Sequence, residues 1–126
     1  MYRSRLGKNL GKITLDYVSS LDDDVEIALY DILGSQAHAI MLHDNKIITK
    51  KEIKKILKGL ENLKKEKFEK KSNSEDIHEL IESLIIKRIG IDAGGKMHTA
   101  RSRNDQVALD IRMKIRDDIN IICQCL

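Results

Sequence analysis

Apolar residues recur three and four positions apart along most of the chain, which is the spacing of one face of an α-helix. The first such segment runs from about residue 21 to 42, with Ser20 as its expected N-cap and three aspartates in its first turn. Thr49 and Glu52 have the spacing of a capping box and begin a second segment, whose stripe reaches Leu63. Strand-like alternation is missing and the chain has no proline, so the sequence predicts an all-α fold.

Two more helices are predicted nearer the C-terminus. One is expected to begin at Ser72 or Ser74 and to end at Gly90. The last begins near Ser102, whose spacing to Asp105 repeats the capping pattern. Its apolar stripe consists of Val107, Ile111, Ile115, Ile119 and Ile122. Because the chain stops on an apolar run without a helix-ending residue, the pattern indicates a helix cut in the middle and a fragment of a longer protein.

The apolar stripe of the first helix is expected to face the core, and it comprises Leu21, Val25, Leu29, Ile32, Leu33, Gln36 and Ile40. Gly34 interrupts this helix at a cost of about 1 kcal/mol relative to alanine, which predicts a close approach of another helix. His38 and His43 are predicted to be surface or packing residues rather than catalysts. His78, taken alone, has the pattern of an ordinary surface histidine beside acids that match the helix dipole.

Composition narrows the class of protein. The 126 residues are 41% hydrophobic and 34% charged, which is typical of one globular domain with an ion-paired surface. Eighteen consecutive apolar residues occur nowhere, and the basic N-terminus lacks the apolar core of a secretory signal. Cys123 and Cys125 are too poorly placed on a helix to bridge, so they are expected to be reduced thiols of a cytoplasmic protein.

Lysines concentrate between Lys46 and Lys71, where eleven of them face four glutamates. Such a stretch raises the alternative of nucleic-acid binding. The stretch has no arginine and one aromatic residue, and its lysines lie opposite an apolar stripe. This pattern favours a solvated helix face and no nucleic-acid partner.

The densest polar stretch is residues 94–107, which hold two glycines, three cations, a histidine and several hydroxyl and amide groups just before the last helix. Glycines permit a close approach of the backbone, arginines bind carboxylates bidentately, and a helix N-terminus favours anions. The run therefore predicts a site for an anionic ligand, although a solvated loop that caps a helix would use the same residue types. Residues 90–96 also have the glycine spacing of a phosphate-binding loop, but Met97 replaces the metal-binding hydroxyl and a helix replaces the preceding strand.

Three stretches resemble argininosuccinate lyases, which belong to the fumarase and aspartase superfamily. Residues 94–107 read GGKMHTARSRNDQV, and the family usually has GGK, then Leu or Met, then HTGRSRNDQV. EDIH at 75–78 and YDILGSQAHA at 30–39 match two further family motifs in the family's order. Related fumarate-releasing lyases carry different first signatures, so the resemblance favours this family over adenylosuccinate lyase, fumarase or aspartase.

The resemblance implies residues 1–102 as an N-terminal helical domain and residues 103–126 as the truncated first helix of a central helical bundle. It implies β-elimination of argininosuccinate to L-arginine and fumarate in arginine biosynthesis, without cofactor or metal, by a cytoplasmic homotetramer whose active sites combine residues from three subunits. The substrate-binding residues that it implies are Ser20, Thr99, Arg101, Ser102, Arg103 and Asn104. The supporting residues that it implies are Asp76, His78, His98 and Asp105.

The chain departs from the family pattern in two respects. The family's catalytic serine lies in a downstream loop with a GSS-x-MP-x-K signature, and neither this run nor the downstream histidine segment occurs here. The isolated chain is therefore predicted to be inactive, and a non-catalytic helical module that binds a partner through its last helix is the alternative. Ala100 stands where the family usually has glycine, and a positive φ at that position would strain the alanine.

Overall fold

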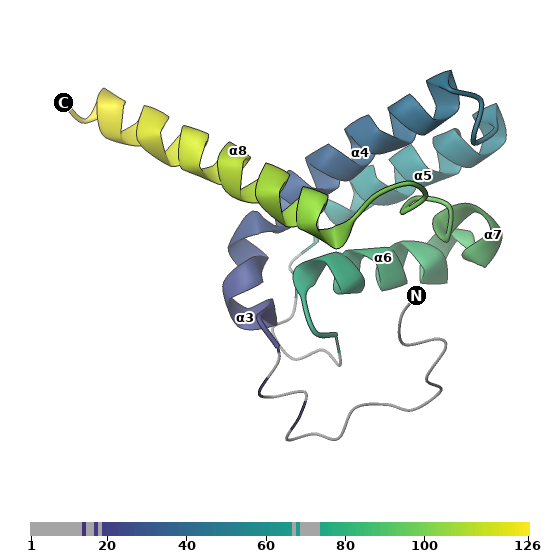
Figure 1. Cartoon of the computed structure of the whole chain (residues 1–126), viewed down its shortest axis with the longest axis horizontal. Helices are drawn as coiled ribbons and strands as arrows, with labels where there is room; N and C mark the ends of the chain where they lie inside the picture. Colours follow the sequence, from purple (N-terminus) through teal and green to yellow (C-terminus); the bar gives the residue numbers. More distant parts are fainter. Residues whose placement is uncertain (1–13, 15–16, 18, 67, 69–73) are drawn as a thin grey trace.

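The computed structural model describes residues 14, 17, 19–66, 68 and 74–126. The elements of this part are α3 (Leu21–Asp24), the 3-10 turn η1 (Val25–Ile27), α4 (Ala28–Asp44), α5 (Lys50–Leu63), α6 (Ile77–Ile89), α7 (Ile91–Gly94) and α8 (Arg103–Gln124). The described residues contain no strand, so the predicted all-α fold is confirmed. Helices α4 and α5 run side by side, α6 crosses near them, and the C-terminal part of α8 extends away from the other helices (Figure 1).

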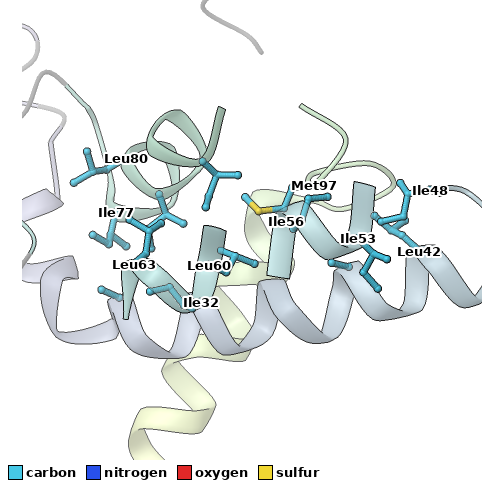
Figure 2. Close-up of a cluster of buried hydrophobic side chains, with 14 of the residues drawn as sticks. Ile32, Leu42, Ile48, Ile53, Ile56, Leu60, Leu63, Ile77, Leu80 and Met97 are labelled. Carbon is cyan, nitrogen blue, oxygen red and sulfur yellow. The ribbon is translucent and has the colours of Figure 1, made fainter. Parts of the chain in front are cut away.

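The core lies between α4, α5 and α6. Its fully buried side chains include Ile32, Leu42, Ile56, Leu60, Leu63, Ile77, Ile81 and Ile85. Figure 2 shows several of them meeting from these three helices, together with Met97. Met97 belongs to residues 94–107, the signature stretch that resembles the lyase motif. The lysines of α5 at positions 51, 54, 55 and 58 are exposed on the opposite side, as expected of a solvated helix face.

Local capping signals position two helices as predicted. Thr49 and Glu52 form both hydrogen bonds of a capping box at the start of α5, and Ser102 and Asp105 do the same at α8. Gly90, with φ of 87°, ends α6 as predicted. These motifs are set by residues three positions apart, so they form wherever the helix begins.

The predicted cap of α6 is wrong. Asp76 is the N-cap, and its Oδ1 accepts a hydrogen bond from the Glu79 amide at 2.6 Å. Ser74 lies two residues before this position, and Ser72 lies outside the described residues. A carboxylate at the N-cap also interacts favourably with the positive end of the helix dipole, which explains why the aspartate is preferred here.

The first predicted helix is divided by the η1 turn, where two β-branched residues, Val25 and Ile27, occur close together. Ser20 occupies the N-cap position of α3, but its hydroxyl donates to Asp24 Oδ2 at 2.6 Å instead of capping the helix. The predicted buried face of α4 is also wrong in part. Leu29, Leu33 and Ile40 are 40–50% exposed, whereas the polar Asp31 and Ser35 are fully buried.

The two buried residues of α8 in the described part of the chain are polar. Gln106 and Asp110 are its buried residues, whereas Ile111, Ile115, Ile119 and Ile122 are 45–59% exposed. No helix in the described part of the chain has the length and hydropathy that a membrane span requires. These four isoleucines form an exposed apolar stripe on α8, and the C-terminal end of this helix projects from the fold (Figure 1).

Candidate functional site

The signature stretch is anchored at its beginning by close packing. A Cβ atom on Gly94 would lie 2.9 Å from the Cα of Ile86, so only glycine allows α7 to approach the α6 backbone this closely. Met97 is buried in the core at 3% exposure. Lys96 pairs with Glu52 of α5. These contacts hold the residues that resemble a phosphate-binding loop within the fold, so the structure gives this loop a structural role.

The next residues form a strained turn against α4. Ala100 has a φ of 56°, which is the left-handed conformation. A positive φ at this position was expected to strain an alanine. His38 of α4 reaches this turn, with its Nε2 2.9 Å from the Thr99 carbonyl oxygen. His38 is thus a packing residue, as predicted. His43 likewise contacts the Ile48 carbonyl, with its Nδ1 at 3.2 Å.

The two arginines of the signature have different surroundings. Arg101 Nη1 donates to Ser35 Oγ at 2.9 Å, and no carboxylate of the described residues forms an ion pair with its guanidinium. Arg103 instead lies 3.4 Å from Asp76 Oδ2 and 3.9 Å from Glu82 Oε2. Arg103 is therefore partly neutralised by ion pairs within the fold, whereas Arg101 has no ion-pair partner among the described residues.

Glycine at position 34 allows Arg101 to lie so close to α4. A Cβ atom on Gly34 would lie 3.0 Å from Leu109 Cδ2 and 3.2 Å from Arg101 Nη2. The close helix approach that the glycine predicted is therefore confirmed, with α8 as the approaching helix. Burial lowers the pKa of Arg101, and the nearby carboxylates of Asp31 and Asp110 oppose that shift.

The other predicted substrate residues lie around the N-termini of α6 and α8. Asn104 and Thr99 are exposed, and so is Ser20, whose amide donates to the Glu75 carbonyl just before α6. Ser102 is engaged as the cap of α8, since its hydroxyl accepts from the Asn104 amide at 3.2 Å. Asp105 completes this cap by accepting from the Ser102 amide at 3.1 Å.

Behind this surface lies a buried cluster in which three helices meet. Asp31 of α4, His78 of α6 and Asp110 of α8 are each at most 2% exposed, so the surface position that the pattern alone indicated for His78 is wrong. His78 Nδ1 lies 3.1 Å from Asp31 Oδ1 and 3.5 Å from Asp110 Oδ2. Gln106 extends the cluster by donating to Asp31 Oδ1 at 2.8 Å, and His98 contacts Gln106 at 3.0 Å.

Burial strongly shifts the pKa of one member of the cluster, Asp110. It raises the pKa of Asp110 from 3.8 to about 7, and the nearby Asp31 adds to this shift, while His78 and Arg101 oppose it. Two carboxylates this close in a dry site repel one another, which favours the protonated form of one of them. Near neutral pH the Asp110 carboxyl group is thus poised between its charged and neutral forms.

The cluster also has the residue types of a metal site. Asp31, His78 and Asp110 offer three ligand atoms within 4.8 Å of one another, and imidazole with carboxylates suits several divalent metals. The nearby Arg101 guanidinium offsets part of the negative charge of these carboxylates. The arrangement of these three side chains therefore permits a cation.

The sequence predicts Asp76, His78, His98 and Asp105 as supporting residues, and the structure adds Asp31, Ser35, Gln106 and Asp110 to their surroundings. The available signal was the polar character of Asp31 and Ser35 four residues apart on α4, and of Gln106 and Asp110 four apart on α8. Residues four apart lie on the same face of a helix. Two polar pairs of this kind within motif-bearing helices indicate a polar contact between those helices.

Comparison with known proteins agrees with the motifs. The sequence model of a family described as Lyase matches residues 9–126. The chain is 71% identical over its whole length to an argininosuccinate lyase of Nitrosopumilus maritimus, of which it covers 26%. It is 43% identical over 98% of its length to that of Methanocaldococcus jannaschii and 46% identical over 92% to that of Methanothrix thermoacetophila, of which it covers 26% and 23%.

The chain spans about a quarter of the length of these relatives. The resemblance to argininosuccinate lyases noted in the sequence is confirmed over the whole chain. The chain belongs to the lyase family whose model matches it.

Proposed function

We propose that this chain supplies part of the active site of an argininosuccinate lyase, the part that binds the carboxylates of the substrate. The observation that carries this proposal is Arg101, a partly buried guanidinium that is held by a neutral hydroxyl and forms no ion pair with a carboxylate of the described residues. A buried cation of this kind favours an anionic ligand, because a carboxylate would compensate the cost of desolvating the guanidinium.

The reaction that we propose is cleavage of argininosuccinate to arginine and fumarate. In a β-elimination a base removes a proton next to a carboxylate, and the negative charge that develops on this carboxylate must be stabilised. Arg101 supplies a fixed positive charge for that step. Proton transfer is assigned to a serine and a histidine of family segments that these 126 residues do not contain.

The remaining substrate contacts are proposed at the N-terminus of α8. Asn104 offers an exposed amide that can both donate and accept, and the exposed hydroxyls of Thr99 and Ser20 are additional candidates. Ser102 and Arg103 act less directly in this proposal. Ser102 caps α8, and Arg103 ties the start of α8 to Asp76 at the start of α6.

Residues 103–126 are proposed to form the first helix of a central bundle in a homotetramer. The support is the exposed stripe of Ile111, Ile115, Ile119 and Ile122, because an uncovered apolar helix face is the surface that bundle packing buries. The active site is then completed by other subunits, and we predict that the isolated chain is inactive. No cofactor, metal or nucleic acid enters this proposal.

The proposal is tested by grafting. Residues 1–126 replace the matching quarter of the Nitrosopumilus maritimus relative, and fumarate release from argininosuccinate is followed by its ultraviolet absorbance. Arg101→Lys in this graft should lower kcat/KM by about ten- to a hundredfold, the range expected for a lost charge-assisted hydrogen bond. Arg88→Lys at the end of α6 is the matched control and should leave the rate unchanged. An active graft with unaffected Arg101→Lys kinetics would remove Arg101 from the site.

A second candidate is a non-catalytic helical module, and the uncovered α8 stripe is the observation that favours it. The graft distinguishes the two candidates. A folded graft that assembles like the parent enzyme but releases no fumarate would support the non-catalytic module over the lyase.

A further inference from the structure

Three residues on one face of α4 contact the strained turn at residues 99–101, called the signature turn below. Gly34 leaves room for the Arg101 guanidinium, Ser35 contacts its Nη1, and His38 contacts the carbonyl of Thr99. Ser35 and His38 are three residues apart and therefore project from the same side of the helix. Together they reach the two residues that flank the strained Ala100.

His38 holds the chain just before this strained residue. The Thr99 carbonyl oxygen can only accept, so the His38 Nε2 at 2.9 Å must carry the proton and donate it. The peptide that follows leads into Ala100, whose φ of 56° is disfavoured for a residue with a Cβ atom. A strained conformation persists only where its surroundings enforce it, and His38 is one of those surroundings.

Ser35 holds the side chain beyond this turn. Its hydroxyl is fully buried and accepts from Arg101 Nη1 at 2.9 Å. A carboxylate at this position would form an ion pair and cancel the charge of the guanidinium, as Asp76 and Glu82 partly do for Arg103. A hydroxyl fixes the direction of the guanidinium while leaving its charge and its other donors available.

We propose that Ser35 and His38 are positioning residues that hold Arg101 and its turn in the orientation that binds a substrate carboxylate. This inference rests on the proposed function of Arg101 and deepens it. Ser35 acts on the guanidinium and His38 acts on the backbone before it, so each is needed for a different part of the geometry. Neither residue takes part in proton transfer.

The kinetic test uses the grafted lyase. Ser35→Ala and His38→Ala should each raise KM for argininosuccinate, and the inhibition constant of succinate, by about tenfold, with a smaller change in kcat. His38→Gln keeps a side-chain donor and should restore most of the affinity. His43→Ala is the matched control, because His43 lies on the same helix and contacts the carbonyl of Ile48, away from the signature turn.

The structural test uses the 126-residue chain and the nitrogen-15 NMR signals of its arginine side chains. Ser35→Ala should make the Arg101 guanidinium signals broaden or approach those of a freely rotating arginine, while the signals of Arg103 stay unchanged. His38→Ala should shift the amide signals of residues 99–101, and His38→Gln should shift them less. Unchanged signals and unchanged KM in both alanine variants would overturn the inference.

The two proposals fail in different ways. If Arg101→Lys leaves catalysis intact, the proposed carboxylate site is wrong, whatever the NMR signals of Ser35→Ala show. If Arg101→Lys impairs the graft while Ser35→Ala and His38→Ala bind substrate normally, the carboxylate site stands and the positioning role of α4 is wrong. Ser35→Thr, which keeps a hydroxyl, and His38→Gln, which keeps a donor, are the conservative variants: both should retain a low KM, and a KM raised as much as in the alanine variants would contradict the positioning role.

Discussion

The buried carboxyl group of Asp110 makes the stability of the chain depend on pH in a specific direction. Its pKa is raised from 3.8 to about 7 in the folded protein, chiefly by burial and secondly by the neighbouring Asp31. Between pH 3.8 and about pH 7, the folded state therefore keeps a proton on Asp110 that the unfolded chain releases. The sign follows directly: stability from this group is full below pH 3.8 and is lost as the pH rises towards 7.

Asp110→Asn removes this ionisation while preserving the size of the side chain. A difference of about three pKa units corresponds to about 4 kcal/mol at 1.36 kcal/mol per unit, and water entry or relaxation around the cluster would reduce it. The variant should therefore gain up to about 4 kcal/mol in free energy of unfolding relative to the parent chain between pH 4 and pH 8. This is a large part of the 5–15 kcal/mol typical of a domain.

The assay is urea unfolding followed by circular dichroism at several pH values. Other titrating groups largely cancel in the difference between the two proteins. Glu52 is one of them: its pKa is lowered to about 2, mainly by hydrogen bonding to Lys96, so its stabilisation is lost as the pH falls below 4.5 in both proteins. Asp118→Asn, with a half-exposed carboxyl on the same helix, is the control. A difference between Asp110→Asn and the parent chain that stays constant within about 0.5 kcal/mol from pH 4 to pH 8 would refute the reasoning.

Three further predictions follow from the packing. Gly94→Ala should destabilise the chain by about 1–3 kcal/mol in urea unfolding, because its Cβ would lie 2.9 Å from the Ile86 backbone; an unchanged midpoint would contradict this. Ala100→Gly should stabilise it by about 0.5 kcal/mol, since relief of the left-handed strain exceeds the added entropy of the unfolded chain, and a lower midpoint would contradict it. Ile115→Lys, at a 50% exposed position of α8, should reduce self-association in analytical ultracentrifugation while changing monomer stability by less than about 0.5 kcal/mol.

The sequence predicted those features that depend on neighbouring residues. The capping boxes at Thr49 and Ser102 formed because each needs only a partner three residues away. The strain at Ala100 and the close approach at Gly34 were also foreseen, since each follows from the special properties of one residue type. The stop at Gly90 belongs to the same group.

The parts that were missed depend on residues distant in the sequence. Helix α4 has apolar residues on two sides, and periodicity alone chose the wrong one in part because Asp31 and Ser35 occupy the buried side. The polar partners that make this burial possible, Gln106 and Asp110, are about 75 residues away on another helix. Only the tertiary arrangement shows that they meet.

The difference between Arg101 and Arg103 was hidden for the same reason. Both lie in one polar run, and both were expected to bind carboxylates. Their partners come from other helices: Ser35 lies 66 positions before Arg101, and Asp76 belongs to the start of α6. Among the residues that the structure describes, Arg103 therefore forms ion pairs and Arg101 forms none.

The most direct test of the account is the rate at which the grafted lyase, carrying residues 1–126 of this chain, releases fumarate from argininosuccinate. We predict a rate similar to that of the parent Nitrosopumilus maritimus enzyme, with a loss of at least about tenfold in kcat/KM for Arg101→Lys. A graft that folds and assembles but releases no fumarate would contradict the claim that this chain carries the carboxylate-binding part of such an active site.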